Sequence, residues 1–248
     1  MVHVEEVMGT VVSFHLVPAP GALQPLREAV SEACRRLHEL DDMLSTWKPH
    51  SPLSRLRRGE VPAEETPAEI AEVLALCRYV KALSGGWFDP WAMPGGVDPT
   101  GLVKGWAVEG ALEPLRRAGA LSAMVNGGGD IALHGAPPGG GPWRVGIRHP
   151  WRPEGLACVL EVTGGAVATS GTYERGAHLV DPRSGQPALA AASATVIGPS
   201  LAVADGLATA LCVGGEEVLA MVGEIAGYAG YLVEGDGKEV WTEGIVFG

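Results

Sequence analysis

Six apolar residues recur at helical spacing between Leu23 and Trp47, and they predict a long amphipathic helix. They are Leu26, Val30, Ala33, Leu37, Leu40 and Leu44. A second helix is predicted after Thr66-Pro67-Ala68-Glu69, which has the pattern of a capping box, and Gly85-Gly86 should end it. Short strand patterns alternate with these and later helices. This order predicts an α+β fold, with helices packed on mainly antiparallel sheets.

Turn residues separate the other predicted elements. The predicted strands span residues 7–17, 121–125, 143–148, 156–162, 167–173, 194–197, 231–233 and 239–241. Further helices are predicted over 102–118, with Pro114 as an interruption, and over 201–213 and 216–225. Residues 45–54 should form a polar, proline-broken loop. We expect one domain over residues 1–248, built from two intimate subdomains.

The composition limits the kinds of partner. Hydrophobic residues make up 46% of the chain and charged residues 19%, which predicts a compact globular protein. A formal net charge of -11 argues against nucleic-acid binding, which needs clustered positive charge. No apolar stretch reaches membrane-spanning length, and neither a signal peptide nor a lipid-accepting cysteine stands near Met1. We therefore expect a cytoplasmic protein without a membrane span.

The four cysteines are far apart in the sequence and form no C-x-x-C pair. Their spacing therefore suggests neither a zinc site nor a redox couple. Three of them lie in apolar helical runs or strands, and buried free thiols are the expected state.

The stretch Asp98-Pro99-Thr100-Gly101-Leu102-Val103-Lys104-Gly105 lies between two apolar helical runs. It places a carboxylate and an ammonium six residues apart around a Pro-Thr-Gly turn. A helix beginning here would point backbone N–H groups at an anion, and Lys104 would neutralise that anion. The alternative is an ordinary turn into a helix with a surface lysine.

Asp205-Gly206-Leu207-Ala208-Thr209 is the second informative stretch. Because Asp205 and Thr209 are four residues apart, they project from the same face of a helix. A carboxylate and a hydroxyl so placed can bind a hard cation such as Mg²⁺. Alternatively, Asp205 interacts with the helix dipole and Thr209 bonds back to a carbonyl.

Two further stretches contain groups suited to phosphate binding or proton transfer. The hydroxyls of Thr169-Ser170-Gly171-Thr172-Tyr173, followed by His178, suit either task, although a lone histidine is often only hydrogen-bonded. The glycines of Asn126-Gly127-Gly128-Gly129-Asp130 allow either a close backbone approach or a flexible hairpin tip. The chain has no nucleophile-elbow serine motif and no P-loop.

Taken together and in this order, the motifs resemble those of the ApbE family of FAD:protein FMN transferases. Besides the stretches above, Met8-Gly9-Thr10, Phe88-Asp89-Pro90 and His178-Leu179-Val180-Asp181-Pro182 carry the resemblance, which covers nearly the whole chain. It implies an Mg²⁺-dependent transferase that cleaves the pyrophosphate of FAD. FMN would be attached as a phosphoester to a threonine of an acceptor redox protein, in a segment containing Ser, Gly, Ala and Thr, and AMP would leave.

The resemblance also implies roles for individual residues. Asp205 and Thr209 would ligate Mg²⁺ by side chain, and Gly101 and Ala208 by backbone carbonyl. Gly101 replaces an alanine common in the family, and glycine should be tolerated because the ligand is a carbonyl. The residues expected to contact or line the FAD site are Met8, Phe88, Asp89, Pro90, Asp98, Lys104, His178 and Leu179.

The acceptor hydroxyl needs a group that orients it or removes its proton. Either His178 or Asp205 is the candidate catalytic residue. Two other functions remain open at this point. One is a FAD pyrophosphatase that releases FMN and AMP, and the other is a flavin-binding protein without catalysis.

Overall fold

The structure is a computed structural model that describes residues 1–171, 179–188 and 190–248. The strands are β1 (Val2–Val7), β2 (Thr10–Pro18), β3 (Ala120–Gly127), β4 (Asp130–His134), β5 (Trp143–His149), β6 (Arg152–Val162), β7 (Gly165–Gly171), β8 (Ala191–Gly198), β9 (Ala229–Glu234) and β10 (Glu239–Trp241). The helices are α1 (Leu23–Leu44), α2 (Pro52–Arg57), α3 (Ala68–Leu83), α4 (Thr100–Arg117), α6 (Leu201–Gly214) and α7 (Glu216–Glu224). Short 3-10 helices occur at Ala63–Glu65 and Pro90–Ala92.

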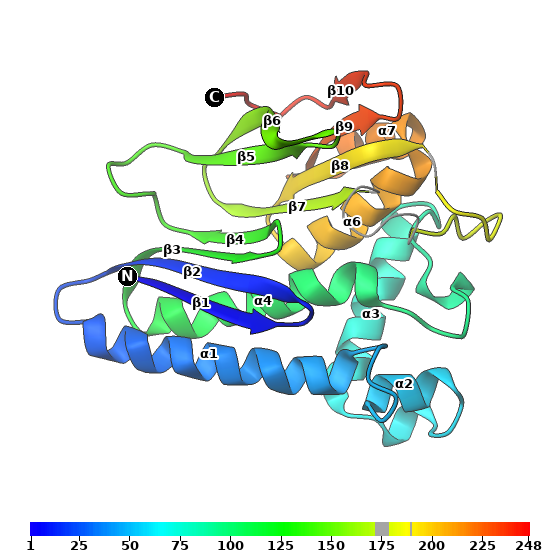
Figure 1. Ribbon diagram of the computed structural model, residues 1–248, viewed down its shortest axis with the longest axis horizontal. Helices are drawn as coiled ribbons and strands as arrows, with labels where there is room; N and C mark the ends of the chain where they lie inside the picture. The colour runs from blue at the N-terminus through cyan, green and yellow to red at the C-terminus, as the bar shows by residue number, and fades with distance from the viewer. Residues whose placement is uncertain (172–178, 189) are drawn as a thin grey trace.

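An eight-stranded sheet in the order β1-β2-β3-β4-β7-β8-β9-β10 forms the centre of the molecule (Figure 1). All of its pairings are antiparallel, as are those of the second sheet, β5-β6. Helices α1, α4 and α6 pack on one face of the large sheet, and β5-β6 packs on the other. The predicted α+β fold with antiparallel sheets is confirmed.

Alternating residues of the central strands face two different hydrophobic cores. Ile131 and Leu133 of β4 and Tyr231 of β9 pack toward β5-β6. Ala132 and Leu232, which alternate with them, pack toward the helices. The large sheet is therefore buried on both faces along these strands.

The chain begins with a hairpin, so the prediction of a single strand over 7–17 was wrong. Strands β1 and β2 pair in register through Val7 and Thr10, and Met8-Gly9 makes the turn. Met8 has φ 56° and Gly9 has φ 68°, the left-handed values of a two-residue hairpin turn. Methionine rarely adopts this conformation, and for that reason the sequence pattern concealed the turn.

Helix α1 begins at Leu23 as predicted and ends three residues before the predicted limit. The loop predicted over 45–54 partly folds into α2, whose first N–H groups are capped by Ser51, with Ser54 N donating to Ser51 Oγ at 2.9 Å. The predicted capping box of α3 does not form. Thr66 Oγ1 instead donates to the carbonyl of Ala63 at 2.7 Å, within the preceding 3-10 turn.

Helix α4 runs without a break from Thr100 to Arg117, so the interruption predicted at Pro114 was wrong. A proline near the end of a helix removes only one hydrogen bond to the residue four positions earlier. The helices predicted over 201–213 and 216–225 are confirmed as α6 and α7, joined at Gly215 with φ 59°.

Cys34, Cys77 and Cys212 are buried, Cys158 is half-buried, and all four are free thiols as predicted. Among the helices of the described residues, none is long and apolar enough to cross a membrane.

Candidate functional site

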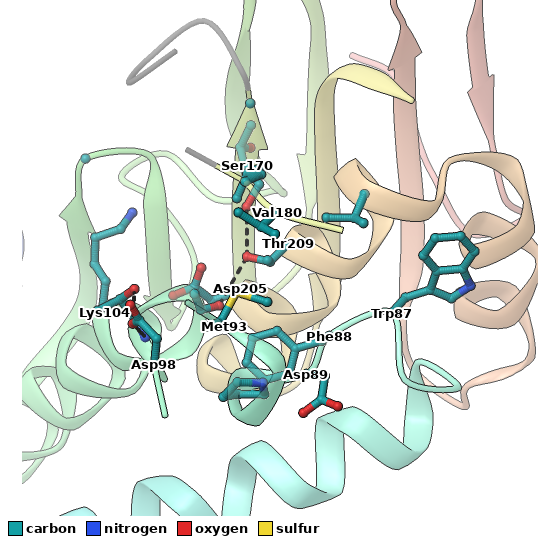
Figure 2. A pocket seen from close by; sticks show the side chains of 18 of the residues that line it. Trp87, Phe88, Asp89, Met93, Asp98, Lys104, Ser170, Val180, Asp205 and Thr209 are labelled. Carbon is teal, nitrogen blue, oxygen red and sulfur yellow. Dashed lines mark hydrogen bonds between the residues drawn. The ribbon is translucent and has the colours of Figure 1, made fainter. Parts of the chain in front are cut away.

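A cavity of about 200 Å³ opens where α4 begins, beside α6 and the end of β7 (Figure 2). The segment from Trp87 to Pro90 forms one wall, and Leu179 and Val180 contribute to another. A second cavity of about 390 Å³ shares Thr10, Gly128 and Thr169 with it. All four stretches singled out in the sequence contribute residues to the first cavity: 98–105, 126–130, 205–209 and the described part, 169–171, of 169–173.

A column of oxygen atoms crosses the cavity between α4 and β7. The hydroxyl of Thr209 donates to the carbonyl oxygen of Gly101 at 3.2 Å. Ser170 Oγ lies 3.3 Å from the same hydroxyl, on the side of β7 (Figure 2). Asp205, one turn earlier on α6, also lines the cavity. The structure therefore brings together three of the four predicted metal ligands.

Close contact between α4 and α6 holds this arrangement. The backbone N–H of Gly105 donates to Asp205 Oδ2 at 2.8 Å. A Cβ atom at position 105 would lie 2.7 Å from both Asp205 Cβ and the Leu201 carbonyl oxygen. At Gly101, a Cβ would lie 2.9 Å from Thr209 Oγ1. Glycine at both positions allows the two helices to approach at the site.

Lys104 forms an ion pair with Asp130, whose side chain is completely buried. The ammonium also donates to the carbonyl of Gly127 at 3.2 Å, and Asp130 Oδ1 accepts from the backbone N–H of Thr169 at 3.2 Å. The three contacts join α4, the β3-β4 hairpin and β7. Lys104 is therefore held against the strands with its charge at the cavity.

Two buried carboxylates share the charge of this one lysine. Burial raises the pKa of Asp130, and the Lys104 ammonium opposes that shift. Burial also raises the pKa of Asp205 well above its usual range, and the neighbouring Asp130 charge adds to the effect. A bound cation would stabilise both carboxylates in their ionised form.

Asp98 lies at the cavity but its oxygens have protein partners. Oδ1 accepts from the backbone N–H of Thr100 at 3.1 Å and from its hydroxyl at 2.7 Å. Oδ2 pairs with Arg57 at 2.9 Å. Asp98 therefore fixes the first turn of α4, and through that turn the carbonyl of Gly101.

Asp89 and Phe88 have different roles in the cavity wall. Asp89 pairs with Lys81 at 2.7 Å and caps the short helix that follows, accepting from Trp91 N at 3.0 Å. Phe88 is buried at 4% exposure and places its ring edge against the start of α4. The predicted 88–90 segment thus forms part of the site.

Two of the predicted site residues that the structure describes, Met8 and Ala208, do not line this cavity. Met8 lies in the β1-β2 turn, and its neighbour Thr10 lines the cavity instead. Ala208 is completely buried in α6. His178 lies outside the described residues, so its role remains a prediction.

The sequence-based list of site residues omitted Asp130, Ser170 and Thr10. Asp130 was visible as the acidic end of the triple-glycine motif, and Ser170 as a hydroxyl beside Gly171. Only the fold shows that one pairs with Lys104 and that the other contacts Thr209.

The described residues fit a hard divalent cation. A carboxylate, a hydroxyl and a backbone carbonyl are oxygen donors of the type that Mg²⁺ prefers. Asp205, Thr209 and Gly101 supply them in one cavity, and a cation there would favour the ionised form of Asp205, whose pKa burial raises well above its usual range.

In this α+β fold, a set of oxygen donors from Asp205, Thr209 and the Gly101 carbonyl lies in one cavity with the Lys104 ammonium. The chain belongs to the ApbE family, whose model matches residues 8–95 and 92–232.

Curated relatives carry the name FAD:protein FMN transferase. A Vibrio cholerae protein of that name is 28% identical, with 85% of this chain and 80% of the relative covered. A Rhodobacter capsulatus protein of that name is 37% identical over 49% of this chain, which spans only 24% of that relative's length.

Solved structures share the fold. The flavin transferase ApbE of Vibrio cholerae superposes with a TM-score of 0.84 at 24% identity, over 98% of this chain and 97% of that chain. The apo form of the Pseudomonas stutzeri flavinyl transferase ApbE gives a TM-score of 0.81 at 26% identity, over 98% and 95% of the two chains.

Proposed function

We propose that the protein is an Mg²⁺-dependent FAD:protein FMN transferase. The hydroxyl oxygen of an acceptor threonine forms a bond to the FMN phosphorus of FAD. The bond between that phosphorus and the bridging oxygen breaks, AMP leaves, and the hydroxyl proton is removed. The observation that carries the proposal is the meeting of Asp205, Thr209 and the Gly101 carbonyl in one cavity with Lys104, in a chain of the ApbE family.

Asp205, Thr209 and the carbonyls of Gly101 and Ala208 would hold the metal. When bound, Mg²⁺ neutralises charge on the pyrophosphate and leaving-group oxygens. Asp205 is oriented for this role by the N–H of Gly105, which occupies one of its oxygens. Ala208 itself is buried in α6 and does not line the cavity.

Lys104 would bind a phosphate oxygen of FAD. Its ion pair with Asp130 and its bond to the Gly127 carbonyl restrict the ammonium to the cavity wall. A lysine already held in place loses little further conformational entropy when the substrate binds.

The wall formed by Phe88, Met93 and Val180 offers an apolar surface for an aromatic ring of the dinucleotide. The first cavity, at about 200 Å³, is below the range of about 300–1,000 Å³ typical of ligand sites. The second cavity, which shares Thr10, Gly128 and Thr169 with the first, would provide further room for FAD.

We retain His178 as the proposed group that orients the acceptor hydroxyl or accepts its proton, with Asp205 as the rival. The two are distinguishable by substitution. His178→Ala should slow FMN transfer while leaving cation affinity unchanged, whereas Asp205→Asn should weaken cation binding as well. Transfer by His178→Ala at the parental rate would reject the histidine role.

The test uses the purified protein with FAD and Mg²⁺, with and without an acceptor fragment containing the Ser, Gly, Ala and Thr segment. Intact mass should show an FMN increment on the acceptor, with equimolar AMP released. EDTA or Asp205→Asn should abolish the increment, and Asp236→Asn, a change in the exposed β9-β10 turn, should not. AMP released without acceptor and with no mass increment would instead identify a FAD pyrophosphatase. Bound but intact FAD would identify a flavin-binding protein.

A further inference from the structure

A cluster of nitrogen, sulfur and oxygen donors lies between β1 and α1. These two elements do not line the first cavity, which holds Asp205, Thr209 and Lys104 and is called the flavin cavity below. His3 and Glu5 alternate along β1 and so share one face of the strand. Cys34 and His38 are one turn apart on α1 and share one face of the helix. Figure 1 shows β1, the edge strand of the large sheet, running alongside α1.

The donor atoms of His3, Glu5 and Cys34 lie close together, and His38 joins them through its contact with Glu5. His3 Nε2 is 3.4 Å from Glu5 Oε2, and His38 Nε2 is 2.7 Å from Glu5 Oε1. Ligand atoms of His3, Glu5 and Cys34 all lie within 4.8 Å of one another. Two ligands bound to one zinc ion at about 2.0–2.3 Å can be at most about 4.6 Å apart. Small side-chain movements would therefore bring His3, Glu5 and Cys34 onto one ion, and His38 would have to turn from Glu5 toward the ion to become the fourth ligand.

The donor types in the β1-α1 cluster favour a transition metal. One imidazole, one thiolate and one carboxylate are ligands typical of zinc, and the imidazole of His38 would supply the fourth ligand of a tetrahedral site, whereas Mg²⁺ and Ca²⁺ prefer oxygen alone. The absence of a C-x-x-C pair in the sequence does not exclude this site, because its ligands come from a strand and a helix rather than from paired cysteines.

The burial pattern gives the cluster a closed side and an open side. Cys34 is buried at 7% exposure beneath the cluster. The side chains of His3 and His38 are 42% and 50% exposed, so an ion can enter from solvent. On binding, the Cys34 S–H gives up its proton to solvent and its sulfur bonds to the metal, with no change in oxidation state.

We propose that His3, Glu5, Cys34 and His38 bind one Zn²⁺ or a similar divalent transition metal and thereby fasten the edge strand β1 to α1. The site is separate from the oxygen-donor set of the flavin cavity, and the proposal does not depend on the proposed transferase activity.

The test measures Zn²⁺ affinity by competition with a chromogenic chelator, in saturating Mg²⁺, on the full chain. We expect one tight Zn²⁺ per chain, and at least about tenfold weaker binding in Cys34→Ser and in His38→Gln, because loss of even an outer-shell partner costs about 10–100-fold. Substituting the half-exposed His38 should leave the fold intact. Co²⁺ should give a thiolate-to-metal charge-transfer band in the parental protein and none in Cys34→Ser.

Matched controls are His15→Gln and Cys158→Ser. His15 is exposed on β2 and pairs with Val2, so it lies on the opposite face of the hairpin from His3, which pairs with Phe14. Both controls should bind Zn²⁺ as the parental protein does, and Zn²⁺ should raise their thermal midpoints equally. Equal Zn²⁺ affinity in the parental protein and His38→Gln would overturn the proposal. Loss of the tight site in Asp205→Asn with retention in His38→Gln would do the same, by placing zinc in the flavin cavity.

Discussion

At the scale of single residues, the site depends on the absence of a side chain at position 105. The N–H of Gly105 donates to Asp205, and the space where a Cβ would lie is occupied by Asp205 and the Leu201 carbonyl. The same helix offers a comparison, because a Cβ at Gly110 would meet no atom within 4 Å. Close packing therefore requires glycine at one position of α4 and not at the other.

Gly105→Ala should lower the free energy of unfolding by about 1–3 kcal/mol, the usual cost of overpacking a filled contact. It should also weaken Mg²⁺ binding, because the added methyl displaces Asp205. Gly110→Ala should raise stability by about 0.5–1 kcal/mol, since alanine loses less backbone entropy in a helix. Urea unfolding and a Mg²⁺ titration of both variants provide the measurement. Equal stability of the two variants would show that α4 and α6 can separate at little cost.

The pair of Lys104 and Asp130 gives a second prediction at this scale. Lys104→Met removes the cation from a carboxylate that is completely buried, so stability at neutral pH should fall by about 3–5 kcal/mol. Combining it with Asp130→Asn should restore much of the stability without restoring FAD affinity. Unfolding by urea and equilibrium binding of FAD measure the two effects.

The loss in Lys104→Met should depend on pH in a defined direction. Burial already raises the pKa of Asp130 above its usual value, and without the ammonium the rise is larger. The folded variant then binds this proton more tightly than the unfolded chain does. The stability deficit of the variant relative to the parental protein should therefore grow as pH rises through the raised pKa of Asp130 and shrink as pH falls toward the ordinary carboxyl range. A deficit relative to the parental protein that instead shrinks as pH rises would contradict the assignment of the buried carboxylate.

At the scale of elements, the start of α4 is held by α2. Arg57 pairs with Asp98 at 2.9 Å and donates to the Pro94 carbonyl at 3.0 Å. Its side chain is only 15% exposed, whereas that of Arg55 on the same helix is 49% exposed. The short helix thus positions the first turn of α4, which presents Gly101 to the cavity.

Arg57→Ala should lower the free energy of unfolding by about 1–3 kcal/mol, since it leaves a half-buried carboxylate and a carbonyl without their partner. It should also raise the KM for FAD, because the α4 start loses its tether. Arg55→Ala should stay within about 0.5 kcal/mol of the parental protein. Thermal unfolding measures the stability of both variants, and steady-state kinetics measures their KM for FAD. If Arg57→Ala is as stable as Arg55→Ala, Arg57 does not hold the start of α4.

At the scale of the whole molecule, two cores share one sheet. The larger core lies between the sheet and the helices, and the smaller lies beneath β5-β6. Strands β4, β7 and β9 contribute alternate residues to both cores. Because both cores pack on the same strands, loss of one core also removes the support of the other. We therefore predict that the chain unfolds as one cooperative unit.

Leu160→Ala tests this prediction in the smaller core. Leu160 is completely buried, so the substitution should cost about 2–5 kcal/mol, while Leu156→Ala on the same strand, at 55% exposure, should cost about 0.5 kcal/mol or less. Calorimetry should show a single transition, moved to lower temperature. Two separated transitions would instead show that the predicted subdomains unfold independently.

How much was predictable from the sequence differs from element to element. Helix α1 was predictable because its apolar period of 3.6 residues is long and regular. The β1-β2 turn was not, because Met8 takes a left-handed conformation that its chemistry does not favour. The Asp205 and Thr209 pair was predictable from a spacing of four residues. The partner of Lys104 was not, since Asp130 lies 26 positions further along the chain, in another element.

The sequence by itself determined the helices other than the short α2, the antiparallel character of the strands, and the residue types of the site, because all of these follow from local periodicity and side-chain chemistry. Tertiary structure alone decided which distant groups meet. It brings Asp205 to Gly105, Thr209 to Ser170 and to the Gly101 carbonyl, and it gathers the β1-α1 donors around one point. The physical reason is that these contacts depend on strand order and on the closeness of helix packing, which spacing along the chain does not specify.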